Sequence, residues 1–267
     1  MASSPGPARA TDAVLGRRER VLLVVPLLGG AAFGGLAFLA APPLAAAFGY
    51  TATDAYVFRL GGAATLGYAV ALALAIRDGG WAAGRWVVLA TLVFNVVSVG
   101  ACAIDIQRGR AQPVVFVILA ASVVIVAIAA TLLARHRAAT APADVAPWVA
   151  LATGVASVAA AVFGTLPLFP GTFAALAGYT GQDPFVWRQA GAATLGYAAM
   201  GVGELTTRRW AEMRLPAVMG LTFNGLAFVA SVIELLARGF TILDALVTPA
   251  SLLFTLVFAL AIARRGR

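Results

Sequence analysis

Ten polar or charged residues lie within or at the ends of long apolar runs, and they are the side chains of this chain that could do chemistry. They form five pairs, and the two members of each pair are 129 positions apart: Thr65 and Thr194, Tyr68 and Tyr197, Asn95 and Asn224, Arg59 and Arg188, Asp105 and Glu234. A polar group at membrane depth is costly in hydrocarbon and usually faces the bundle interior or a cavity. These ten residues are therefore the candidate binding residues.

Two asparagines carry the strongest signal. Asn95 and Asn224 stand near the centres of their apolar runs, each directly after a phenylalanine. An interhelical hydrogen bond from such an amide, to Thr65 or Tyr68 at similar depth, contributes on the order of 1 kcal/mol. Two interpretations stay open: hydrogen bonding between helices, or the lining of a pore or pocket.

The charged candidates lie toward one end of the expected helices. Arg59 opens one apolar run and Asp105 closes the next, so two antiparallel helices would bring them to the same depth. We therefore expect Arg59 to pair with Asp105, and Arg188 with Glu234. The alternative is a paired-charge site for an ion, a proton or an anionic headgroup. A general-acid role for these carboxyls is disfavoured, because a neighbouring arginine favours the ionised form.

Metal and redox chemistry have little support. Cys102 is the only cysteine and His136 the only histidine, so one chain forms neither a disulfide, nor the usual zinc site, nor a bis-histidine haem. We expect no metal and no cofactor. A further carboxyl, Glu204, has the apolar counterpart Ala75, so any role it has is not shared; a place near the inner membrane interface is expected.

The composition indicates an integral membrane protein. Of 267 residues, 61% are hydrophobic and 11% charged, against about 25% charged in soluble domains. The net charge of +8 comes from arginine alone, and the arginines lie between the apolar runs. This pattern favours membrane topology and anionic headgroups at the cytoplasmic face over nucleic acid as the partner. A homo-oligomer or a membrane partner subunit stays open.

The apolar runs predict an all-α protein with about eight transmembrane helices. We expect them near 21–41, 55–76, 86–107, 113–134, 147–169, 185–206, 215–237 and 244–263. With the N-terminus inside, 14 of the 19 arginines fall in inner segments. Because cytoplasmic loops carry the excess of arginine, we expect a multi-pass protein of the cell membrane with both termini in the cytoplasm.

The chain contains an internal duplication. Gly49–Asp105 aligns with Gly178–Glu234 without a gap, with 22 identities in 57 positions. Four helices per unit keep both copies in one orientation, so we expect two tandem parallel repeats related by a pseudo-twofold axis along the membrane normal. The expected organisation is a disordered cytoplasmic tail, a first four-helix repeat, a cytoplasmic linker and a second repeat, at 1–20, 21–137, 138–146 and 147–267.

Within the duplication, the octapeptide GAATLGYA occurs twice without change, at Gly62–Ala69 and Gly191–Ala198. Ala63 and Gly67 are four residues apart and share one helix face. Small residues at that spacing let two backbones approach closely in lipid. We interpret the octapeptide as a helix-packing seam; the alternative is a substrate-binding role for its threonine and tyrosine.

Three classes of function remain. Parallel repeats with polar residues at mid-depth are typical of a transporter or channel for a small solute, ion or lipid, and this is the expectation we place first. The alternatives are an accessory or assembly subunit, and a membrane-embedded enzyme acting on a lipid or isoprenoid.

Overall fold

The computed structural model describes residues 13–49, 55–136, 142–169, 171, 184–239 and 241–267. Within these ranges every regular element is a helix, apart from one isolated β-bridge between Val14 and Gly80, which confirms the all-α prediction. The elements are α1 (Arg17–Leu39), α2 (Ala41–Ala47), α3 (Ala55–Asp78), α4 (Trp81–Gln107), α5 (Pro113–Arg135), α6 (Pro147–Thr165), η1 (Leu166–Leu168), α8 (Pro184–Thr207), α9 (Trp210–Arg238) and α10 (Ile242–Ala263).

Several helix starts and ends follow from local sequence. Pro113 and Pro147 occupy the first position of α5 and α6, where a missing N–H costs nothing. Helix α10 starts with a capping box, in which Asp244 N donates to Thr241 Oγ1 at 3.2 Å. Gly239, with φ +84°, ends α9, because glycine adopts a positive φ without strain.

Seven of the described helices are long and apolar enough to cross a membrane: α1, α3, α4, α5, α6 with η1, α9 and α10. This supports the prediction of a membrane protein. Helix α8 coincides with the predicted span 185–206 and is 24 residues long, but it is not one of the seven. It is less apolar than the others because it contains Arg188, Gln189 and Glu204. The predicted count of eight spans is therefore not confirmed.

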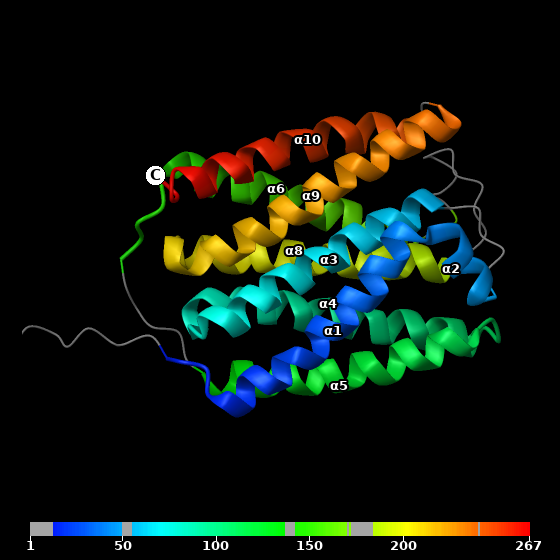
Figure 1. Ribbon diagram of the computed structural model, residues 1–267, viewed down its shortest axis with the longest axis horizontal. Helices are drawn as coiled ribbons and strands as arrows, with labels where there is room; N and C mark the ends of the chain where they lie inside the picture. Colours follow the sequence, from blue (N-terminus) through cyan, green and yellow to red (C-terminus); the bar gives the residue numbers. More distant parts are fainter. Residues whose placement is uncertain (1–12, 50–54, 137–141, 170, 172–183, 240) are drawn as a thin grey trace, which may run out of the picture.

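The helices are arranged in central and peripheral sets (Figure 1). Helices α3, α4, α8 and α9 form the centre, and α1, α5, α6 and α10 pack on them. Helix α3 packs mainly against α1 and α9, and α8 mainly against α6 and α4, whereas the sequence neighbours α3 and α4 touch much less. The two halves of the chain are therefore joined through their central helices.

Both described chain ends lie at one end of the bundle (Figure 1). We call the end that holds Arg17 and Ala263 the terminal end, and the opposite end, where α4 joins α5 and α9 joins α10, the distal end. The membrane side that each end faces stays a prediction.

Residues 13–16 are held against the α3–α4 turn at the terminal end. Leu15 N donates to Gly79 O at 2.8 Å, Trp81 N donates to Ala13 O at 2.9 Å, and Leu15 is 1% exposed. Gly79 has φ +69°, and a side chain there would meet the Arg20 guanidinium, so both the backbone and the space require glycine. Residues 13–20 therefore do not belong to the tail expected over 1–20; residues 1–12 lie outside the described part.

A similar contact closes the α8–α9 turn. Asp144 N and Val145 N donate to Arg208 O at 3.1 and 3.2 Å, and Trp210 N donates to Asp144 Oδ1 at 2.6 Å. Arg208 adopts φ +50° at the position 129 residues after Gly79. The end of the expected linker 138–146 is thus fixed to the bundle, while residues 137–141 lie outside the described part.

The two octapeptides pack against each other at the centre of the bundle. Tyr68 Oη donates to Ala193 O at 2.7 Å, and Tyr197 Oη donates to Ala64 O at 2.7 Å. The two tyrosine rings meet edge to face, with 5.2 Å between their centroids. Each copy thus supplies the acceptor for the tyrosine of the other.

The glycines of the octapeptide make this exchange possible. A Cβ on Gly67 would overlap Tyr197 Oη, and a Cβ on Gly196 would overlap Tyr68 Oη. The seam interpretation of the octapeptide therefore agrees with the packing, and the tyrosines take part in it directly. We call these four residues the tyrosine–glycine seam.

Candidate functional site

Two cavities of similar size lie among the described residues, one in each half of the chain. The first cavity, of about 180 Å³, lies among α1, α3, α4 and α5, and the second, of about 160 Å³, among α6, α8, α9 and α10. Each also receives side chains from the other half: Gln189 lines the first, and Leu60 lines the second. Both are close in volume to an engineered apolar cavity of about 150 Å³ that binds benzene.

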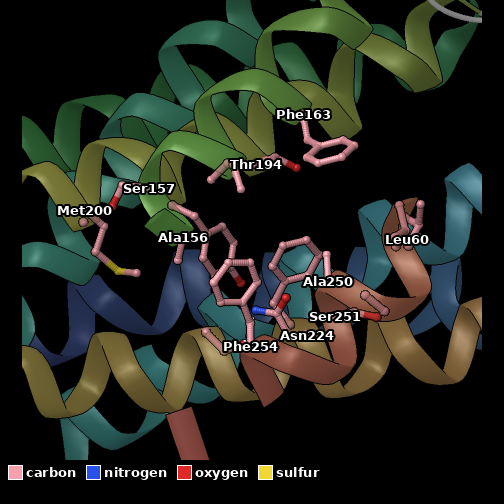
Figure 2. A pocket seen from close by; sticks show the side chains of 18 of the residues that line it. Leu60, Ala156, Ser157, Phe163, Thr194, Met200, Asn224, Ala250, Ser251 and Phe254 are labelled. Carbon is pink, nitrogen blue, oxygen red and sulfur yellow. Dashed lines mark hydrogen bonds between the residues drawn. The ribbon is translucent and has the colours of Figure 1, made fainter. Parts of the chain in front are cut away.

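The second cavity is long, narrow and mostly apolar. Its wall on α8 runs from Trp187 to Glu204, which corresponds to roughly 25 Å at 1.5 Å per residue. Figure 2 shows Asn224 and Phe254 facing Thr194 across the cavity. A few polar groups in an apolar wall are typical of small-molecule sites.

Six of the ten candidate residues line a cavity. Thr65, Tyr68 and Asn95 line the first, and Thr194, Tyr197 and Asn224 line the second. The octapeptide thus contributes to a cavity wall as well as to the seam, so its two interpretations are compatible.

The asparagine amides do not form the expected bond to Thr65 or Tyr68. Asn95 Nδ2 donates to Thr91 O and Asn224 Nδ2 to Gly220 O, both at 2.8 Å and four residues back in the same helix. That carbonyl is the nearest acceptor for a short side chain within a helix, and it satisfies the donor without a second helix. Among the described residues no donor contacts either amide oxygen, so both are left for a cavity occupant.

A chain of hydrogen bonds crosses the wall of the first cavity. Ser122 Oγ donates to Ser98 Oγ at 3.1 Å, Ser98 Oγ donates to Gln189 Oε1 at 2.8 Å, and Gln189 Nε2 contacts Cys102 Sγ at 3.7 Å. Gln189 and Ser98 were not predicted, because only polar residues present in both copies were taken as candidates and their counterparts are Leu60 and Ala227. A polar position whose counterpart is apolar was the signal that could have found these two. Ser122 was also not predicted, although its counterpart Ser251 is polar.

Glu204 is the one carboxyl that lines either of these two cavities. It lies on the wall of the second cavity with 3% of its surface exposed, about one turn before the end of α8. Its place near the inner membrane interface stays a prediction. No hydrogen bond or ion pair to its carboxyl oxygens is formed in the described part of the chain. Its counterpart Ala75 is fully buried and lines neither cavity.

The four charged candidates lie at the distal end and line neither cavity. Arg188 Nη1 is 3.0 Å from Asp105 Oδ1, and both side chains are buried. The predicted pairs, Arg59 with Asp105 and Arg188 with Glu234, are wrong: neither forms between these described side chains. Helix α4 packs against α8 of the other half rather than against α3, so Asp105 meets Arg188. Arg59 is half-buried.

A second buried carboxylate at the terminal end shows how such a group is normally satisfied. Glu212 is fully buried and lies 2.8 Å from Arg209 Nη1 and 3.5 Å from Arg85 Nε. Trp86 Nε1 donates to it at 3.0 Å, and Thr207 Oγ1 at 3.1 Å. Since Arg85 and Trp86 come from the other half, this cluster also joins the halves.

Comparisons with known proteins add no identity. No protein-family model matches the chain, and no curated protein or solved structure matches it at a significant level. Within the described ranges, no three His, Cys, Asp or Glu side chains are grouped as a metal site would need. Function is therefore inferred from the two cavities and their lining.

Proposed function

We propose that this chain is a transporter-like protein that carries a small amphipathic solute across the cell membrane through its two cavities. The observation that carries the proposal is the duplicated lining: a threonine, a tyrosine and an asparagine, each 129 positions from its counterpart, line two separate cavities. A mostly apolar wall suits an apolar solute body, and the free amide oxygens suit one hydrogen-bond donor.

The topology that goes with this function is eight spans in two parallel repeats, with both termini in the cytoplasm. At 1.5 Å per residue the 24 residues of α8 extend roughly 36 Å, enough to cross a bilayer core of about 30 Å. An even number of spans returns the chain to the side of the membrane from which it started. This agrees with the fact that both described chain termini lie at the same end of the bundle. The gap-free offset and the reciprocal bonds of Tyr68 and Tyr197 support a twofold relation along the membrane normal.

The alternative functions, an ion channel, an enzyme and an accessory subunit, agree less well with the two cavities and their lining. An ion pathway needs a run of charged or carbonyl groups, and both cavities are mainly apolar. An enzyme using Asp105 as an acid is disfavoured, since this carboxyl is held by Arg188 away from both cavities. An accessory subunit would have no need of two cavities with matched polar residues. The bilayer and anionic headgroups remain the proposed partners.

Cysteine accessibility tests the proposal without a known substrate. In a Cys102→Ala background, Asn95→Cys and Asn224→Cys are reconstituted in liposomes and treated with a membrane-impermeant methanethiosulfonate, on one side or on both. A transport pathway must reach water, so we expect both positions to react. The matched controls are Ala64→Cys and Ala193→Cys. These two alanines belong to the two octapeptides, are buried, and line neither cavity.

Labelling of the asparagine positions at no more than the rate of the alanine controls would mean that the cavities are closed packing voids. The transporter proposal would then fail.

A further inference from the structure

The second cavity holds a buried acid that no group in the described part of the chain neutralises. Glu204 has 3% of its surface exposed, and no charged or hydrogen-bonding group in the described part of the chain reaches its carboxyl. Glu212, eight residues later, is equally buried but has two arginines and two further donors. An isolated buried carboxylate is costly, so such groups usually mark a site whose partner comes from outside.

The side chains around Glu204 leave it available. Ser157 Oγ, on the facing helix α6, donates to Thr153 O at 2.6 Å and so is committed to its own helix. Gly201 lies one turn before Glu204, and the absence of a side chain there makes room for Ser157. The carboxyl thus meets the cavity without a competing protein donor.

The wall that α10 contributes to the same cavity is aromatic. Phe254 and Phe258 on α10 line the cavity, with 6.3 Å between their ring centroids, and Gly220 on α9 lets the Phe258 ring approach closely. Aromatic faces attract cations and pack well against another ring. A carboxyl and a phenylalanine wall in one cavity of about 160 Å³ suit a cation that carries a ring-sized apolar body.

We propose that the second cavity is a site for a small organic cation, with its ammonium group at the Glu204 carboxylate and its apolar body against Phe254 and Phe258. The inference rests on the proposed function and names the class of solute. It applies to the second cavity alone, because the position equivalent to Glu204 is Ala75, and because the polar groups of the first cavity are uncharged.

Three ligands with the same ring test the proposal: phenethylammonium, phenethyl alcohol and phenylacetate, which are a cation, a neutral molecule and an anion. Equilibrium binding of each radiolabelled ligand is measured on the full chain in nanodiscs, with empty nanodiscs correcting for partition into lipid. We expect the ammonium to bind at least about tenfold more tightly than the alcohol, since it forms a desolvated ion pair, and the anion not to bind.

Two variants assign the preference to Glu204. In Glu204→Gln and Glu204→Ala the preference for the ammonium should vanish while the alcohol still binds. Glu204→Gln has nearly the same shape and removes no protein contact of the carboxyl, so its thermal stability should not fall. The matched control is Asp78→Asn, which removes a carboxylate at the terminal end that pairs with Arg77 and Arg214 outside the cavity; it should keep the preference.

The outcomes separate the two proposals. If the wild-type chain binds the alcohol as tightly as the ammonium, or if Glu204→Gln keeps the preference, the cation site is wrong although the cavity does bind a solute. A loss of thermal stability with an unchanged preference would make Glu204 structural and would also overturn the cation site. If none of the three ligands binds above the empty nanodiscs, the cation site is wrong, and the cysteine labelling of Asn95→Cys and Asn224→Cys decides the transporter proposal separately.

Discussion

The two cavities have a common frame and different polar chemistry. Both contain the asparagine, threonine and tyrosine that lie 129 positions apart. The first has the hydrogen-bonded chain through Gln189 and Ser98, whereas the second has Leu60 and Ala227 at those positions and an unpartnered Glu204. The shared residues hold the helices and outline the cavities, and the unshared residues differentiate them.

The distal charges differ between the halves in the same way. Arg188 is buried and paired with Asp105, while the equivalent Arg59 is half-buried and, among the described side chains, forms no ion pair. Equivalent positions in the two copies therefore make different interactions, so we expect substitutions there to change the free energy of unfolding by different amounts. The predictions below test how far the two halves behave alike.

The largest difference is expected for the two arginines. Arg188→Ala leaves the buried Asp105 carboxylate uncompensated and should lower the free energy of unfolding by about 3–5 kcal/mol. Arg59→Ala should cost about 0–1 kcal/mol, because Arg59 is partly exposed and forms no ion pair with a described side chain. Denaturant unfolding in detergent measures both, and the double change Arg188→Leu with Asp105→Leu should recover much of the loss. Equal losses for the two single changes would mean that the burial difference has no energetic effect.

The tyrosine–glycine seam should respond alike in the two halves. Gly67→Ala and Gly196→Ala each place a Cβ against a tyrosine hydroxyl and a backbone carbonyl, so each should cost about 1–3 kcal/mol in stability. Gly100→Ala, in α4 with open space around it, is the control and should stabilise slightly because alanine favours helix. Thermal unfolding of the three variants checks this. A loss in only one of the two seam variants would contradict the reciprocal packing.

The smallest effect is expected in the hydrogen-bonded chain of the first cavity. Gln189→Leu makes that position resemble Leu60 and removes the acceptor of Ser98, so stability should fall by about 1 kcal/mol. Ser98→Ala should cost a similar amount, and the double change less than the sum, because both remove one bond. A double-mutant cycle measures the coupling; strict additivity would show that this bond contributes nothing.

Much of the fold followed from the sequence because hydrophobic periodicity and length are local properties. Each apolar run contains one helix, with ends within a few residues of those expected. The residues at the cavity walls, such as Asn95 and Asn224, were also found, since a polar side chain in an apolar run is visible without a structure. Polar residues without a polar counterpart, such as Gln189, were missed, and the place of Glu204 in a cavity wall was not predicted.

The sequence by itself determined the helices, their apolar character, the arginine asymmetry and the 129-residue offset, because each depends on composition and spacing along one chain. Only the tertiary structure decided which helix meets which. Asp105 pairs with Arg188 because α4 packs on α8, and each seam tyrosine bonds to the other octapeptide because α3 and α8 meet at their glycines. Packing partners depend on side-chain shape across the whole bundle, which no local pattern records.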